Sequence, residues 1–203
     1  MDDKNKIIAY AEEKFSTLGF FKTTMDELAK EMRISKKTIY KHFSSKNILV
    51  KAVLDTVRFS ISSLITKIVE GDDNAVVKLY KISELLSRRI SKISAAWLND
   101  LRIHAPELWN EIEQFRKMMI QKNLTLIVEQ GKREGLIVDK PTVIILTIIL
   151  SSVQAVVNPE FVINNNLSMR EAAKVTLDVV FSGILTKKGR KIFKEFKSGN
   201  QNE

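Results

Sequence analysis

Lysine and hydroxyl side chains are concentrated between residues 35 and 43 of this 203-residue chain. Within that segment Ile39 and Phe43 are four residues apart, so both lie on one side of a helix and can be buried there. The side chains left for the outer face are Lys36, Lys37, Thr38, Tyr40, Lys41 and His42. Ammonium groups displace counterions from phosphates, and lysine and hydroxyl groups hydrogen-bond to base edges. This face is therefore predicted to bind DNA in a major groove, which is wide enough to admit one helix.

Two short helices joined by a tight turn are expected to position this face. The first begins at Thr24, whose hydroxyl can cap the helix, and Glu27 three residues later completes a capping box. Arg33 lies in the turn, Ser35 caps the second helix, and a third helix begins at Lys46. The alternative for this segment is a helical hairpin whose basic face is merely solvated.

The same segment resembles the helix-turn-helix of the TetR (tetracycline-repressor-like) family of bacterial transcriptional regulators. The resemblance rests on TMDELA at 24–29, ISKKTIYKHF at 34–43, and Ser45, Lys46 and Leu49. The family often has glycine in the turn, where this chain has Arg33. If the turn requires a positive φ, a residue other than glycine costs about 1 kcal/mol there.

From the spacing and the resemblance together we expect two kinds of DNA contact. Lys36, Lys37 and Lys41 are expected near base edges. The expected phosphate and positioning contacts are Thr24, Ser35, Thr38, Tyr40, His42 and Lys46.

Composition favours an all-α, globular protein. Only seven Gly and three Pro occur, and apolar residues recur at helical spacing over long stretches. The absence of cysteine excludes a disulfide framework and thiolate chemistry and fits the cytoplasm. The first residues, MDDKNKIIAY, do not form a signal peptide.

The net charge of +9 is unevenly distributed, since residues 30–51 carry +6 and residues 52–185 carry +1. Positive charge localised in this way indicates a nucleic-acid face.

Apolar periodicity predicts the remaining helices, and the chain is expected to divide into three regions. The predicted helices cover residues 3–18, 46–70, 74–92, 94–104, 106–133, 141–157 and 168–186. We expect a three-helix DNA-binding domain at 1–45 and a helical ligand-binding and dimerisation bundle at 46–187. The core of the DNA-binding domain is predicted to hold Ile8, Ala11, Phe15, Leu28, Ile39 and Phe43. The basic tail, 188–203, is expected to be a solvated end, with DNA or an acidic partner as the alternative.

The segment 141–157 is the most apolar in the chain and is shorter than the roughly 20 residues that span a bilayer. A helix that is apolar on most sides must be covered on most sides, so a partner chain is a natural cover and no membrane is expected. TetR-like proteins pair through their last two helices, which implies a homodimer, with packing inside one chain as the alternative. The expected interface residues are Ile144, Ile148, Ser151, Ala172, Thr176, Val179 and Gly183.

Aromatic and methionine residues recur at positions that could line an apolar ligand pocket between bundle helices. The expected ligand-binding residues are Phe59, Trp97, Leu101, His104, Phe115 and Met119. The alternative is that these side chains form an ordinary core. We find no HExxH, phosphate-binding glycine loop or Gly-x-Ser-x-Gly, so no catalytic residue, metal site or cofactor is expected.

The sequence thus predicts a homodimeric regulator that binds a near-palindromic operator in double-stranded DNA. The resemblance implies a repressor released by an unknown apolar small molecule. The competing hypothesis is a helical ligand-binding or protein-interaction module without specific DNA binding.

Overall fold

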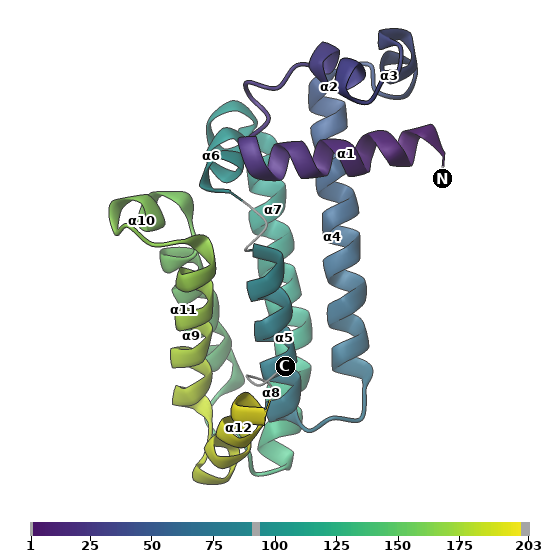
Figure 1. The fold of residues 1–203 in the computed structure, drawn as a ribbon. Helices are drawn as coiled ribbons and strands as arrows, with labels where there is room; N and C mark the ends of the chain where they lie inside the picture. Colours follow the sequence, from purple (N-terminus) through teal and green to yellow (C-terminus); the bar gives the residue numbers. More distant parts are fainter. Residues whose placement is uncertain (1, 91–93, 200–203) are drawn as a thin grey trace. The chain divides into compact units, whose positions relative to one another are not determined.

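The computed structural model describes residues 2–90 and 94–199, which form helices joined by turns apart from one isolated β-bridge between Ile137 and Leu185 (Figure 1). In chain order the α-helices are α1 (Asp3–Leu18), α2 (Met25–Glu31), α3 (Lys36–His42), α4 (Lys46–Glu70), α5 (Ala75–Ile90), α6 (Ala95–His104), α7 (Pro106–Met119), α8 (Thr125–Arg133), α9 (Thr142–Val156), α10 (Pro159–Asn164), α11 (Met169–Ile184) and α12 (Lys187–Gly199). The all-α prediction is confirmed for the part of the chain that the structure describes.

The predicted helix bounds agree closely with those observed in the first half of the chain. Helices α1 and α4 span the predicted residues 3–18 and 46–70. Gly19 ends α1 with φ 81°, and its N–H donates to the carbonyl of Phe15 at 2.9 Å. A left-handed φ of this kind is easily adopted by glycine, which has no Cβ.

The predicted single helix over 106–133 is interrupted by a π-helical turn at Ile120–Leu124, which joins α7 to α8. Asn123 is buried in this turn and donates a hydrogen bond from its side chain to the carbonyl of Met119 at 3.1 Å. A π-helical turn adds one residue without ending the helix, so apolar spacing alone does not reveal it.

Helix α10 was not anticipated from the sequence. The side chain of Asn158 accepts a hydrogen bond from the N–H of Phe161 at 2.9 Å, and Pro159 occupies the first turn. The Asn-Pro pair is a helix-start signal that could have predicted this short element.

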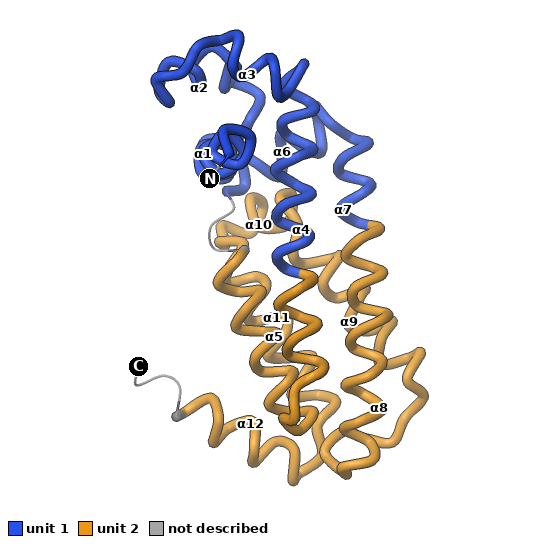
Figure 2. Tube along the Cα trace, turned by 90° about the vertical axis from the view of Figure 1, so that its right-hand side faces the viewer, with its two compact units in different colours: residues 1–61, 92–113 blue, residues 62–91, 114–203 orange. Residues whose placement is uncertain are grey.

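The chain forms two compact units (Figure 2). Residues 1–61 and 92–113 make unit 1, and residues 62–91 and 114–203 make unit 2. Helices α4 and α7 contribute residues to both units. The division into 1–45, 46–187 and 188–203 concerns function and remains a prediction.

Unit 1 is built on an aromatic cluster between α1 and α6. The ring of Trp97 stacks on Phe15 with centroids 5.6 Å apart, and Phe20 meets Trp97 edge-on at the same separation. The six predicted core residues of the DNA-binding domain are all buried, which confirms that prediction. The side chains of Leu18 and Phe21, by contrast, are more than half exposed.

Unit 2 is organised around α5, which packs against α8, α11 and α12. The tail expected to be a solvated end is instead helix α12, and this corrects the prediction for residues 188–199. Phe193 and Phe196 of α12 meet the ring of Tyr80 on α5 edge-on, at 6.1 and 5.3 Å between centroids. Five of the six basic side chains of α12 are exposed, whereas Lys197 pairs with Asp178 of α11. The sequence of the tail is therefore amphipathic at helical spacing.

Gly189 allows the start of α12 to approach the chain that follows α8. A Cβ at this position would lie 2.2 Å from the carbonyl oxygen of Leu136. Alanine normally favours a helix over glycine by about 1 kcal/mol, but a clash with backbone cannot be relieved by a side-chain rotation. We expect Gly189→Ala to lower the free energy of unfolding by about 2 kcal/mol, measured by chemical denaturation. Lys194→Ala, at an exposed position of the same helix, is the control and should change stability little.

Candidate nucleic-acid interface

The predicted cap of α2 is present in full. The N–H of Glu27 donates to the Thr24 hydroxyl at 3.1 Å, and the N–H of Thr24 donates to the Glu27 carboxylate at 2.7 Å. Hydrogen bonding from the Thr24 backbone, and then from the Thr24 side chain, lowers the pKa of the Glu27 carboxyl. The Thr24 side chain is therefore occupied in starting the helix, although it remains exposed.

The turn between α2 and α3 has a positive φ at a residue that is not glycine. Arg33 has φ 55°, in the left-handed region that normally favours glycine. The N–H of Ile34 donates to the carbonyl of Ala29 at 3.0 Å, which closes the turn. Arginine is thus held in a conformation that costs about 1 kcal/mol relative to glycine.

Helix α3 presents its cationic face to solvent. Ile39 and Phe43 are buried as predicted, while Lys36, Lys37, Tyr40 and Lys41 are exposed. Thr38 and His42 are half-buried at the edges of this face. The arrangement leaves the side chains expected near base edges on the outside of the helix.

Two contacts organise the first turn of α3. Ser35 caps the helix by accepting from the N–H of Thr38 at 3.0 Å, and the two hydroxyls lie 2.8 Å apart. Lys36 forms an ion pair with Asp26 of α2. Both charged groups are exposed, so this pair contributes little to stability.

Helix α1 is tied to α2 through one carboxylate. Glu31 accepts from the Tyr10 hydroxyl at 2.7 Å and from the Lys14 ammonium at 2.8 Å. Lys14 and then Tyr10 lower the pKa of Glu31 by these hydrogen bonds. Local sequence patterns do not reveal this link, because it joins residues far apart in the chain.

Lys46, expected to contact phosphate, faces the protein instead. Its ammonium donates to the carbonyl oxygens of Phe20 at 3.1 Å, Phe21 at 2.9 Å and Thr23 at 3.1 Å. The side chain is half-buried.

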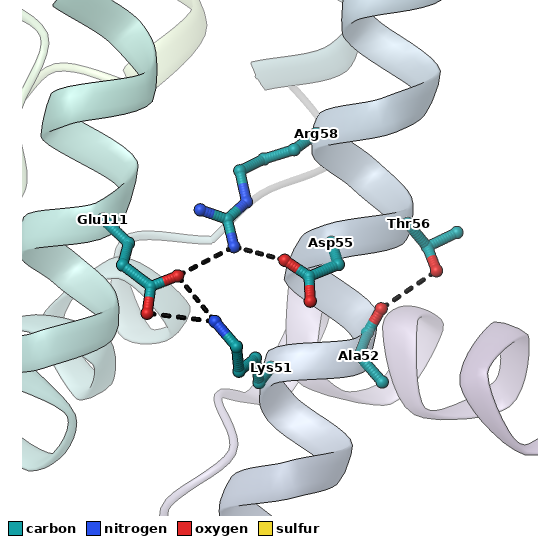
Figure 3. Close-up of polar contacts among 6 residues, drawn as sticks. All are labelled: Lys51, Ala52, Asp55, Thr56, Arg58 and Glu111. Carbon is teal, nitrogen blue, oxygen red and sulfur yellow. Dashed lines mark hydrogen bonds and ion pairs between the residues drawn. The ribbon is translucent and has the colours of Figure 1, made fainter.

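An ion-pair cluster in unit 1 connects α4 to α7 (Figure 3). The Glu111 carboxylate accepts from Lys51 at 2.7 and 3.0 Å and from Arg58 at 3.1 Å. Arg58 also pairs with Asp55, one turn earlier on α4. Hydrogen bonds from Lys51 and then Arg58 lower the pKa of Glu111. The cluster fixes the first half of α4, which directly follows the turn after α3.

This cluster makes a pH-dependent contribution to stability. Because the pKa of Glu111 is lower in the folded than in the unfolded state, its contribution is present above the unfolded pKa and is lost as pH falls through the folded value. We expect Glu111→Gln to reduce the free energy of unfolding at pH 7, and we expect the difference from the unsubstituted protein to shrink as pH falls through the folded pKa. Denaturation by urea over a series of decreasing pH values measures this, and Glu107→Gln, exposed on the same helix, should show no such convergence.

The six expected ligand-binding residues are divided between the two units. Phe59, Trp97, Leu101 and His104 belong to unit 1, whereas Phe115 and Met119 belong to unit 2. Trp97 and Leu101 are buried, and Trp97 is part of the aromatic cluster with Phe15 and Phe20, which favours the core alternative for it. His104 stacks on Phe21, and Phe59 is 78% exposed. The ligand site remains a prediction.

The expected dimer residues lie on α9 and α11, which pack against each other in unit 2 (Figure 1). Ile144, Ile148, Ser151, Val179 and Gly183 are exposed.

Ala172 and Thr176, by contrast, are buried within the protomer, which corrects the predicted stripe on α11. They share the inner face of the helix with Ile184, at spacings of four and eight residues. The exposed stripe consists of Val175, Val179 and Gly183. The predicted interface includes residues from both faces of α11, because small and apolar side chains occur on each.

Comparison with known proteins agrees with the helix-turn-helix geometry. Residues 7–53 match the family model for bacterial regulatory proteins of the tetR family. The uncharacterized HTH-type transcriptional regulator YvaF of Bacillus subtilis (strain 168) is 25% identical over 165 residues, covering 81% of this chain and 86% of that protein.

The chain is a DNA-binding transcriptional regulator with a helix-turn-helix segment of the tetR type at residues 7–53. The matched segment contains α1, α2, α3 and the start of α4. Solved structures extend the similarity in fold to most of the chain. A TetR-family regulator from Marinobacter aquaeolei VT8 has a TM-score of 0.74 at 16% identity and 98% coverage of both chains. A transcriptional regulator from Cytophaga hutchinsonii ATCC 33406 has a TM-score of 0.71 at 20% identity, covering 91% of this chain and 100% of that one.

In this regulator the helix-turn-helix is formed by α2 and α3. Within residues 2–90 and 94–199, none of its helices has the length and apolarity needed to cross a bilayer.

Proposed function

We propose that this TetR-family regulator is a homodimeric repressor that places α3 of each protomer in a major groove of a near-palindromic operator. The observation that carries the proposal is the exposed cationic face of α3, held outward by the burial of Ile39 and Phe43. Lys36, Lys37 and Lys41 would meet base edges. Thr24, Ser35, Thr38, Tyr40 and His42 would contact or position phosphates.

Pairing through α9 and α11 is supported by the exposed apolar side chains on these helices. Ile148 is 50% exposed and Val179 is 66% exposed. Large aliphatic groups gathered on adjacent helices indicate an interaction surface, and a two-fold axis presents the same surface on both chains. A dimer of this kind spaces the two α3 helices by about one DNA turn or a multiple of it.

Release by a small apolar molecule is the regulatory part of the proposal. A ligand that binds better to a dimer whose α3 helices no longer match the groove spacing lowers the population of the DNA-binding form. Phe59 and His104 in unit 1, and Phe115 and Met119 in unit 2, remain candidate contacts, whereas Trp97 and Leu101 are buried and Trp97 belongs to the aromatic cluster. Analysis of the small molecules that co-purify with the protein from cell extract would identify the effector.

Gel-shift titration tests DNA binding against the alternative of an interaction module. The probes are a duplex selected from a random pool by the protein and a scrambled duplex of equal length. A DNA-binding regulator predicts a shift specific to the selected duplex and a steep loss of affinity as salt rises. If no sequence is enriched by selection, or if binding is equal for both probes, the proposal of a specific operator is wrong.

A further inference from the structure

The loop between α1 and α2, residues 19–24, is held from one side by Lys46. The ammonium of this first residue of α4 donates to the carbonyls of Phe20, Phe21 and Thr23, at 2.9 to 3.1 Å. It also lies 5.9 Å from the ring centroids of both Phe20 and Phe21. An ammonium group has three N–H donors, so these carbonyls use all of them. None of the three is left for a phosphate oxygen.

Asp100 of α6 holds the same loop from a second element. Its carboxylate accepts from the N–H of Phe21 at 2.8 Å. A Cβ at Gly19 would lie 2.4 Å from the same carboxylate oxygen, so the absence of a side chain there allows Asp100 to reach the loop. The Phe21 ring stacks on His104 of α6, with centroids 3.6 Å apart and planes 9° apart.

The position of this loop determines the position of α3 within unit 1. The loop ends at Thr24, whose hydroxyl and N–H start α2 through the capping box with Glu27. Helix α2 packs directly against α3. A displacement of the loop relative to α4 and α6 is therefore passed through the short, rigid α2 to the exposed face of α3.

We propose that Lys46 and Asp100 are positioning residues for operator binding, which clamp the α1–α2 loop between α4 and α6 and act on DNA through the placement of α3. The inference rests on the proposed binding of DNA by α3. It assigns Lys46 a role other than the phosphate contact expected from the sequence. Asp100 is assigned a role that favours DNA binding, although its negative charge by itself repels the DNA phosphates.

The direction in which Asp100→Ala changes the affinity for DNA distinguishes a positioning role from a purely electrostatic one. Removal of a negative charge should strengthen binding to a polyanion if charge alone matters. Loss of the loop clamp should instead weaken binding to the selected duplex about tenfold, the size expected when a hydrogen bond to a charged group is lost. Glu13→Ala, which removes an exposed carboxylate from α1, is the charge-matched control and should not weaken binding. Asp100→Asn keeps an acceptor oxygen and should restore most of the affinity.

Lys46→Gln provides an independent test through the salt dependence. If Lys46 contacts a phosphate, the slope of log K against log salt becomes shallower by about 0.9 in magnitude. If Lys46 is a positioning residue, affinity falls about tenfold while the slope stays unchanged. Lys46→Arg retains charge and donors and should recover part of the loss.

Amide hydrogen exchange supplies a readout without DNA. We expect faster exchange at residues 21–24 in Asp100→Ala and Lys46→Gln than in the unsubstituted protein or in Glu13→Ala, with thermal unfolding confirming that each variant is folded. If Asp100→Ala does not fold, the Lys46→Gln slope and exchange rates decide the question.

The inference is overturned if Asp100→Ala binds as tightly as or more tightly than the unsubstituted protein, if Lys46→Gln reduces the slope, or if exchange in the loop is unchanged. A protein that selects no duplex, yet shows the expected exchange pattern, would contradict the proposed operator binding and leave the loop clamp established.

Discussion

Replacing Lys37 and Lys41 together by alanine lowers the affinity for the selected duplex by about 3 kcal/mol, roughly 150-fold, since each is expected to lose a base contact of about 1 to 3 kcal/mol. Both side chains are exposed on α3, and neither is needed for the buried face formed by Ile39 and Phe43. The large effect on DNA should therefore come with little change in stability. Fluorescence anisotropy at a fixed salt concentration measures the affinity, and denaturation measures the stability.

The matched control removes two other exposed lysines. Lys67→Ala and Lys117→Ala, on α4 and α7 in unit 2, change the net charge by the same amount. We expect the control to bind within a few-fold of the unsubstituted protein. A comparable loss in the control would mean that total charge, rather than the face of α3, determines affinity. Dissociation of the dimer in the Lys37 and Lys41 variant would contradict the proposed separation of functions.

Aspartate at Ile148 and Val179 is expected to convert the protein to monomers. The proposed two-fold interface would bury each introduced carboxylate twice, without a cationic partner, at a cost of several kcal/mol. Both positions are exposed in the protomer, so the folded chain itself tolerates the change. Sedimentation equilibrium measures the loss of the dimer. DNA affinity should fall by more than 100-fold, because one α3 helix then loses the contribution of its partner.

Leu126→Asp tests whether the effect is specific to this surface. Leu126 is an exposed apolar residue of α8, 54% accessible, and lies outside the proposed interface. The variant should remain dimeric and bind DNA normally. If Leu126→Asp gave monomers while the Ile148 and Val179 variant stayed dimeric, the interface would have to be placed on a different face.

Local patterns predicted the DNA-binding helices well because their determinants are close in sequence. Thr24 and Glu27 define the start of α2, and Ile39 with Phe43 defines the buried side of α3. The positive φ at Arg33 could also be anticipated, because the resemblance identified the turn position where glycine is usual. Each of these signals extends over only a few residues, the range at which capping and helical periodicity act.

The errors occurred where long-range packing chooses between alternatives that local patterns leave equivalent. The tail has an amphipathic spacing, but its helix is stabilised by the rings of Phe193 and Phe196 against Tyr80. On α11, the faces carrying Thr176 and Val179 both look suitable for an interface in the sequence. Contact with α5 and α9 buries the first face and leaves the second exposed.

The sequence alone determined the all-α class, the helix-turn-helix and the outward cationic face of α3, since propensity, capping and periodicity are encoded by neighbouring residues. The tertiary structure decided which charged groups form hydrogen bonds within the protein. Lys46 resembles a phosphate ligand by type and position, but three carbonyls from a loop more than 20 residues earlier take its donors. Asp100, nearly 80 residues after Phe21, completes the same clamp. These groups come into contact only when α1, α4 and α6 pack together, and sequence periodicity carries no information about such long-range contacts.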